Sequence, residues 1–182
     1  MRIVVNGRSY AWPVAPLVVV CVDGSEPDYM DDAIAAAAMH WLAAASARGT
    51  DLIVDCVVPS FTNPNNLSIV TGVSPAVHGI AGNYFYDREA GAEVMMNDPS
   101  MLRCSTILAA FADAGARVAV VTAKDRLRRL LGHELRGGVC FSAERAHDEA
   151  TLEDNGIDNV TKAGNPADTM GHSPSRFTGA SL

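Results

Sequence analysis

Apolar residues gather in three short segments along the 182-residue chain, at residues 17–22, 52–58 and 117–122. All three are rich in β-branched side chains, and none alternates strictly between apolar and polar positions. Continuous apolar segments of this length are typical of strands that are covered on both faces, as in parallel sheets. The pattern therefore predicts three buried strands.

Helical patterns separate these segments. An Ala-rich stretch at 31–48 begins with two aspartates and ends at Arg48-Gly49, which matches the start and stop signals of a helix. Further helices are predicted at residues 63–71, 105–114, 126–131 and 143–155. Alternating strands and helices predict an α/β fold with a mostly parallel sheet flanked by helices.

The predicted sheet is incomplete, and the last residues lack a pattern. Residues 1–157 are expected to form one α/β domain, and residues 158–182 an irregular polar tail, as a truncated or frame-altered product would have. A sheet of three or four strands leaves an unpaired edge and exposed apolar surface. We therefore expect a homodimer or another form of self-association.

Composition and net charge limit the classes of function that this chain can have. Hydrophobic residues make up 48% and charged residues 19% of the chain, which excludes wholesale disorder. The net charge of -7 argues against nucleic acid or an anionic membrane as partner. No apolar run is long enough to span a bilayer, and no signal peptide is evident, so a cytoplasmic location is expected. The four cysteines form no CxxC pair and are expected to be reduced and mostly buried.

A polar residue follows each predicted strand: Asp23, Thr62 and Lys124. Ligands of open α/β sheets bind beyond the carboxyl ends of the strands, so these side chains would face one crevice. Each also has a simpler interpretation. Asp23 fits an Asx-turn, Thr62 a helix cap, and Lys124 a solvated charge. Together they favour a shared site for an anionic ligand.

Thr62 stands just before Asn63-Pro64, an N-cap followed by proline at the first helical position. A helix N-terminus stabilises negative oxygens through its N–H groups and its dipole. A threonine hydroxyl is a poor nucleophile unless a base or a metal removes its proton. Asp23 could anchor such a metal, and zinc suits this role.

The motifs that carry these residues resemble a known family. They are VCVDG at 20–24, PSFTNPNNLSIVTG at 59–72 and SPAVHGIAGNYFYD at 74–87. They resemble the alkaline phosphatase superfamily, with its type I phosphodiesterases and nucleotide pyrophosphatases, and within it the phosphonoacetate hydrolases. Segments 122–127 and 140–145 extend the resemblance, which covers most of the chain.

The resemblance implies an alkaline phosphatase-like core with two zinc ions, which cleaves the carbon–phosphorus bond of the small molecule phosphonoacetate to acetate and phosphate. Thr62 then matches the nucleophile and a zinc ligand, and Asp23 a second ligand of the same zinc. Asn83 matches an amide that binds a phosphonate oxygen. Lys124 matches the lysine that holds the substrate carboxylate. Arg126 stands where the family tends to have a second lysine, which keeps the charge but changes the geometry.

The family's remaining zinc ligands have no clear match. Asp168 and His172 repeat an Asp-x-x-x-His spacing, but they lie in the unpatterned tail, where chance also explains them. His78 is a third candidate, although the spacing Pro75-x-x-His78-Gly79 favours a structural role in a loop.

Two other functions stay open. A phosphatase or phosphodiesterase of the same superfamily would use the same nucleophile on a phosphate ester, where no substrate carboxylate calls for Lys124. A truncated, inactive domain would bind an anion or a partner without catalysis. Asp23 and Thr62 alone are fewer ligands than a stable zinc site needs.

Overall fold

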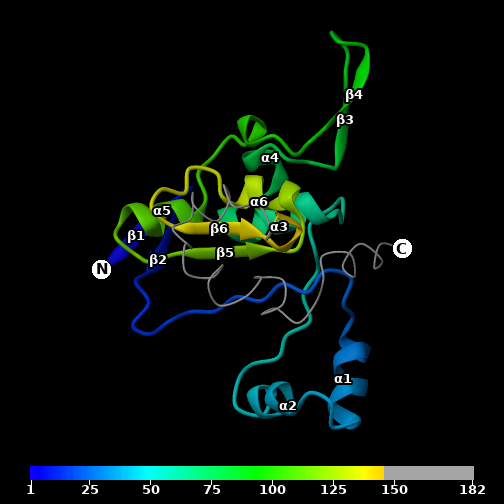
Figure 1. Cartoon of the computed structure of the whole chain (residues 1–182), viewed down its shortest axis with the longest axis vertical. Coiled ribbons are helices and arrows are strands. Elements are labelled where there is room, and N and C mark those ends of the chain that lie inside the picture. The colour runs from blue at the N-terminus through cyan, green and yellow to red at the C-terminus, as the bar shows by residue number, and fades with distance from the viewer. Residues whose placement is uncertain (146–182) are drawn as a thin grey trace. The chain divides into compact units, whose positions relative to one another are not determined.

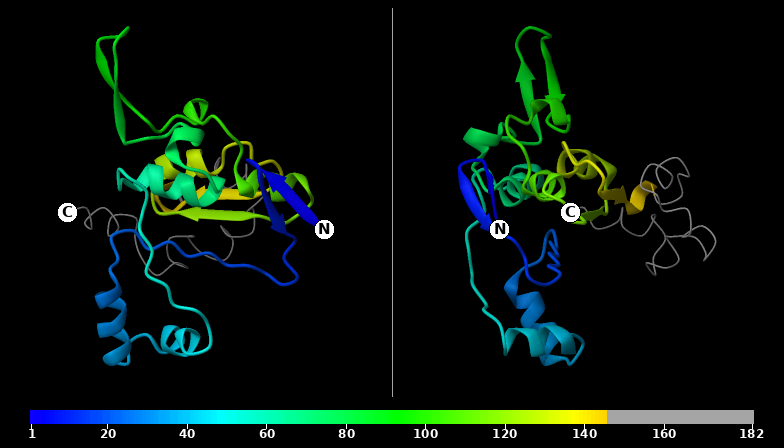
Figure 2. Two further views of the ribbon diagram at one scale, coloured as in Figure 1. Left: turned by 180° about the vertical axis from the view of Figure 1, so that it is seen from behind. Right: turned by 90° about the vertical axis from the view of Figure 1, so that its left-hand side faces the viewer.

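The computed structural model describes residues 1–145. The chain divides into two units. Unit 1 contains Met1–Trp12 and the described residues from Val57 onward, and unit 2 contains Pro13–Cys56. Figures 1 and 2 show the elements of each unit.

The centre of unit 1 is a parallel pair of strands, β5 (Ala119–Thr122) and β6 (Val139–Ser142), with helix α6 (Asp125–Leu131) between them in the chain. Helix α3 (Thr62–Thr71) packs against α6. Apolar side chains from these elements and their connections form the core, namely Leu67, Ile80, Leu102, Val120, Leu130 and Leu131. The predicted strand at 117–122 and the predicted helices at 63–71 and 126–131 are thereby confirmed.

An N-terminal hairpin, β1 (Arg2–Val5) and β2 (Arg8–Ala11), holds the end of α3. The Asn6 side chain in its turn donates hydrogen bonds to the carbonyl oxygens of Thr71 (2.9 Å) and Ser105 (2.8 Å). One amide group thus ties the hairpin to the last residue of α3 and to the segment that leads into the helix at Ile107–Asp113. The sequence pattern did not predict this hairpin.

Gly72 ends α3 in the left-handed conformation, with φ of 70°. A Cβ atom at this position would collide with the Tyr10 hydroxyl of strand β2. Glycine is therefore required here for its backbone and for the close approach of the hairpin. The predicted end of this helix is confirmed.

The other elements of unit 1 are short. Helix α5 is capped by Thr106, whose buried hydroxyl oxygen accepts a 3.0 Å hydrogen bond from the Ala109 N–H. Strands β3 and β4 form an antiparallel hairpin, which extends away from the parallel pair within this unit (Figure 1). The bounds are α4 (Pro75–His78), β3 (Tyr84–Asp87), β4 (Ala92–Met95), α5 (Ile107–Asp113) and the two 3₁₀ turns Pro99–Met101 and Ala143–Arg145.

Unit 2 contains two helices, α1 (Pro27–Ala35) and α2 (His40–Ser46), where the sequence predicted one. The first begins earlier than predicted because Pro27 is pre-set for the first helical turn. Ala37 then takes a positive φ of 56°, which ends it. Alanine favours helix but buries little apolar surface, and neither helix has a buried residue, so no packing sustains one long helix.

The two strands predicted at residues 17–22 and 52–58 are not formed. Both segments are extended but unpaired, and most of their apolar side chains are exposed. Among the described residues, β5 and β6 are the parallel pair, whereas the other pairs are antiparallel. A buried strand needs neighbours on both sides, and the described residues supply none to these segments.

The predicted burial of the cysteine side chains is corrected as well. Cys21 and Cys56, which lie in the unformed strands, are exposed, whereas Cys104 and Cys140 are half-buried. None of the four is paired in a disulfide, and none is fully buried, whereas most were expected to be buried.

Residues 146–182 lie outside the described part of the chain. Only the first turn of the helix predicted at 143–155 is therefore described, and the boundary at residue 157, the tail, Asp168 and His172 stay predictions. None of the described helices has the length and apolar character that a membrane crossing requires.

Leu67 tests the packing of α3. It is fully buried in the core, whereas Ile69 on the same helix is 51% exposed. Leu67→Ala is expected to lower the free energy of unfolding by about 2–5 kcal/mol, because it leaves a cavity. Ile69→Ala, the matched control, should cost less than about 1 kcal/mol. Urea denaturation of the two variants measures both values, and equal losses would contradict this packing.

Candidate active site at the start of helix α3

Thr62 is the first residue of α3, and Phe61 takes the N-cap position predicted for Asn63. The Asn65 N–H already bonds to the Phe61 carbonyl at 3.2 Å, and Pro64 has no N–H. Thr62 is half-buried, and its side chain stands at the positive end of the helix dipole. A negatively charged oxygen is stabilised at this position.

Asn83 is tied to this helix start through Met96. The Asn63 side chain donates a 3.2 Å hydrogen bond to the Met96 carbonyl, and the Met96 N–H donates a 2.8 Å bond to the Asn83 carbonyl. Asn63 directly follows Thr62, so the predicted nucleophile and the predicted phosphonate-binding amide are held on one framework. The sequence pattern predicted a cap role for Asn63 and gave no sign of this connection.

His78 fixes the other side of α3. Its ring is fully buried, the Ile80 N–H donates to Nδ1 at 3.2 Å, and Nε2 lies 3.0 Å from the Ser68 hydroxyl oxygen. Since Nδ1 accepts, Nε2 carries the proton and donates to Ser68, whose hydroxyl donates in turn to the Pro64 carbonyl at 2.8 Å. Both ring nitrogens are engaged within the protein, which favours the structural role for His78 over the metal role.

The burial of this ring lowers the pKa of His78. Desolvation disfavours the charged imidazolium, and this effect exceeds that of the backbone hydrogen bonds. A protonated ring would also place a donor at Nδ1 against the Ile80 N–H. The neutral ring is therefore the form that supports α3.

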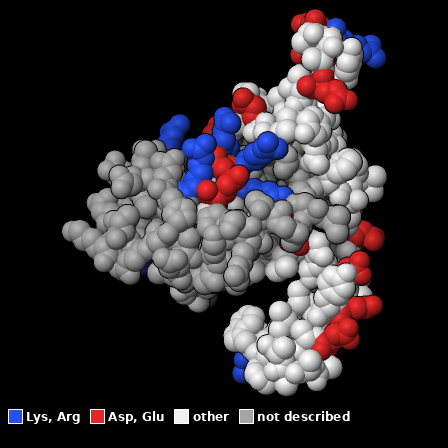
Figure 3. Space-filling model, turned by 45° about the vertical axis from the view of Figure 1, so that its right-hand side comes forward, with Lys and Arg blue, Asp and Glu red and all other residues white. Residues whose placement is uncertain are grey.

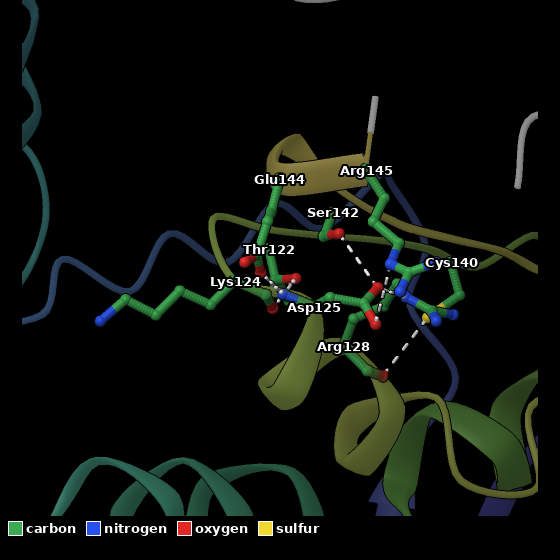
Figure 4. A network of polar contacts seen from close by, with 8 residues as sticks. All are labelled: Thr122, Lys124, Asp125, Arg128, Cys140, Ser142, Glu144 and Arg145. Carbon is green, nitrogen blue, oxygen red and sulfur yellow. Dashed lines mark hydrogen bonds and ion pairs between the residues drawn. The ribbon is translucent and has the colours of Figure 1, made fainter. Parts of the chain in front are cut away.

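Asp125 is the centre of a polar network at the carboxyl ends of β5 and β6 (Figure 4). Its Oδ1 accepts hydrogen bonds from Arg128 Nε at 2.5 Å and from the Ser142 hydroxyl at 3.1 Å. Arg145 Nε lies 3.6 Å from Oδ2. The hydrogen bond from Arg128 is the main cause that lowers the pKa of Asp125, so the carboxylate stays charged and holds both arginines.

Lys124 is the N-cap of α6, and its backbone belongs to this network. The Thr122 hydroxyl donates to the Lys124 carbonyl at 2.9 Å, and the next N–H, of Asp125, donates to a Glu144 carboxylate oxygen at 2.7 Å. The exposed Lys124 side chain points away from the network (Figure 4). Arg126, on the first turn of α6, is exposed as well.

Within residues 1–145, neither Lys124 nor Arg126 forms an ion pair. Figure 3 shows Lys and Arg side chains close to Asp and Glu side chains on one face of the molecule. Among the described residues, the two predicted substrate-binding cations thus stand at the end of β5 without an ion-pair partner, at the start of the helix that packs against α3.

The described residues offer few metal ligands. They contain no group of three or more His, Cys, Asp or Glu side chains that could hold a metal ion. Asp23 and Thr62 supply oxygen donors of a kind that zinc accepts, but zinc takes three or four protein ligands. Asp23 belongs to unit 2 and Thr62 to unit 1, so their pairing on one metal stays a prediction.

Comparison with known proteins establishes the class. Residues 17–130, more than half of the chain, match the model of the type I phosphodiesterase / nucleotide pyrophosphatase family. The chain belongs to this family.

Solved relatives show a more particular likeness. The phosphonoacetate hydrolase of Sinorhizobium meliloti 1021 is 54% identical in its complex with phosphonoformate and 53% in its complex with phosphonoacetate. Both matches have a TM-score of 0.83 and cover 94% of this chain. An ectonucleotide pyrophosphatase/phosphodiesterase of Caenorhabditis elegans is 32% identical in an alignment of 89 residues that covers 44% of this chain.

These matches confirm the predicted resemblance to phosphonoacetate hydrolase and the alkaline phosphatase-like α/β fold class. The chain spans 41% of the length of the solved hydrolase and 10% of the length of the worm protein. The roles of Asp23, Thr62, Asn83, Lys124 and Arg126 stay predictions.

The lowered pKa of His78 predicts a pH dependence of stability. The unfolded chain takes up the His78 proton near pH 6.5, about the ordinary value, whereas the folded chain resists it. Stability is thus fully present above about pH 6.5 and falls as the pH drops below it, by at most about 1.4 kcal/mol per pH unit. Urea denaturation between about pH 5 and 8 measures this slope.

His78→Gln should reduce the slope, because the variant lacks the titrating group. His40→Gln is the control, since His40 is exposed on α2. A slope unchanged by His78→Gln would show that another group causes the acid sensitivity.

Proposed function

We propose that this chain carries the nucleophile and the substrate-binding residues of a phosphonoacetate hydrolase, with Thr62 as the nucleophile. The observation that supports this most is the placement of Thr62 at the start of α3, joined through Asn63 and Met96 to Asn83. The 54% identity to a solved hydrolase supports the substrate.

In the proposed reaction, Thr62 Oγ1 attacks phosphorus and forms a phosphothreonine. The carbon–phosphorus bond breaks, and its electron pair leaves with carbon, which takes a proton to give acetate. Water then attacks the phosphothreonine, releases phosphate and restores Thr62. Zinc, held in part by Asp23 and Thr62, would lower the pKa of the attacking hydroxyl and offset the charge of the phosphonate.

The residues of this chain stabilise both ends of the substrate. The N-terminus of α3 and the Asn83 amide would bind phosphonate oxygens as charge builds on them. The carbanion-like leaving group spreads its charge onto the adjacent carboxylate. Lys124 would hold that carboxylate, and Arg126 adds a second positive charge beside it.

A phosphodiesterase activity is the second candidate. The family match and the similarity to the Caenorhabditis elegans phosphodiesterase favour it. It would use the same Thr62 on a phosphate ester.

The cytoplasmic location and the self-association stay predictions. The exposed apolar residues of unit 2 would drive self-association wherever nothing else covers them.

The nucleophile is tested by phosphate release from phosphonoacetate in the presence of zinc, with the full 182-residue chain. Thr62→Ala is expected to abolish release, because it removes the only atom that can form the phosphothreonine. Thr62→Ser should retain part of the activity, since it keeps the hydroxyl. Release that survives in Thr62→Ala, with its circular dichroism unchanged, would assign the nucleophile elsewhere.

Lys124 separates the two candidate activities. Lys124→Ala should reduce kcat/KM for phosphonoacetate about 10–100-fold, the range for losing a hydrogen bond to a charged group. Hydrolysis of a phosphodiester without a carboxylate should change little. Arg129→Ala, an exposed cation on the same helix, is the control. Equal losses on both substrates would contradict a carboxylate-binding role.

A further inference from the structure

Three asparagines stand near the start of helix α3, namely Asn63, Asn65 and Asn66. Asparagine is less favourable than alanine within a helix, because its side chain competes for backbone hydrogen bonds. The N-cap residue, Phe61, makes no side-chain hydrogen bond to the helix, and Pro64 has no N–H. The first turn, which carries Thr62, therefore depends on other contacts to stay rigid.

Asn66 holds the backbone of Thr62. Asn66 is buried, and its Nδ2 donates a 2.9 Å hydrogen bond to the Thr62 carbonyl oxygen. Residues four apart lie on one face of a helix, so the amide reaches this oxygen across a single turn. The bond fixes the plane of the peptide group that follows Thr62. It thereby restricts where the Thr62 hydroxyl can lie.

Asn63 sets the position of Asn83 relative to Thr62. Its Nδ2 donates to the Met96 carbonyl at 3.2 Å, and the Met96 N–H donates to the Asn83 carbonyl at 2.8 Å. The Met96 side chain packs against the core of unit 1, so this residue is itself anchored. One side-chain amide thus connects the residue that would attack phosphorus to the residue that would bind the phosphonate.

Asn65 makes a different contact. Its Oδ1 accepts a 3.4 Å hydrogen bond from the Val57 N–H, in the segment that leads to the helix. This bond involves neither Thr62 nor Asn83. The bonds of Asn63 and Asn66 are therefore the ones that reach the candidate site.

We propose that Asn63 and Asn66 are positioning residues, which hold Asn83 and Thr62 in the relative placement that attack on phosphorus requires. Neither side chain needs to touch the substrate. A fixed geometry lowers the entropy cost of the reaction, and a misplacement of about 1 Å can reduce the rate about 100-fold. The catalytic consequence rests on the proposed function, whereas the two hydrogen bonds can be tested without activity.

Steady-state kinetics with the full 182-residue chain, zinc and phosphonoacetate test the catalytic consequence. Asn63→Ala and Asn66→Ala are each expected to reduce kcat about 10–100-fold and to leave KM nearly unchanged, because correct placement matters most in the transition state. Alanine favours a helix, so this loss would not come from a weaker helix. Asn63→Gln keeps an amide donor and should restore part of kcat. Asn97→Ala is the matched control, since Asn97 is also half-buried but donates to the Met95 sulfur, and it should retain the wild-type kcat.

NMR measures the positioning without catalysis. In Asn63→Ala, the Met96 amide should exchange at least about 10-fold faster, because its peptide segment has lost a hydrogen bond that holds it. In Asn66→Ala, the carbonyl carbon resonance of Thr62 should move, since this oxygen has lost a donor. The Ala109 amide of α5 should exchange at its wild-type rate in both variants, which separates a local displacement from a general loss of stability.

An unchanged Met96 amide in Asn63→Ala, or an unchanged Thr62 carbonyl resonance in Asn66→Ala, would overturn the proposal. Wild-type kcat in both variants, together with a lower free energy of unfolding, would overturn it as well, because the asparagines would then only stabilise the helix. If the wild-type chain releases no phosphate, the proposed function fails. The two NMR measurements then decide by themselves whether Asn63 and Asn66 hold Asn83 and Thr62 in place.

Discussion

The buried hydrogen bond between the His78 ring and the Ser68 hydroxyl fixes the position of α3, on which the candidate site depends. The same ring accepts from the Ile80 N–H, so one neutral imidazole joins the helix to the loop that leads toward Asn83. Met96 makes a second connection, between Asn63 and Asn83. Thr62 is thus held by groups that do not react. Placing a nucleophile in this way lowers the entropy cost of reaching the attacking geometry.

At the end of β5, charged side chains are arranged around Asp125. Asp125 holds Arg128 and Arg145 in hydrogen bonds and ion pairs, which leaves their charges compensated. The backbone of Lys124 is fixed by the same network, while its ammonium group extends into solvent. An exposed lysine has no desolvation cost to overcome, so it can meet a carboxylate that arrives from solution. The Asp125 network thus positions the backbone of Lys124, for which a carboxylate-binding role is proposed above.

The hydrophobic pattern predicted the elements whose partners lie nearby. Strand β5 and helices α3 and α6 form as expected because Leu67, Val120 and Leu130 bury one another. The position of Thr62 at a helix start followed from Asn63-Pro64. The polar contacts were not predictable, since the bond from Asn63 to Met96 joins residues 33 positions apart. The two hairpins were missed because their strands are only four residues long.

Residues 17–22 and 52–58 show what a hydrophobic pattern encodes. Their composition is that of strands buried on both faces, yet the described residues leave them extended and exposed. The pattern correctly identifies segments with the composition of buried strands. It wrongly predicts that these segments are buried strands in the described structure. Unit 1 closes its own core around α3 and α6, whereas the apolar side chains of residues 17–20 and 52–54 in unit 2 are exposed.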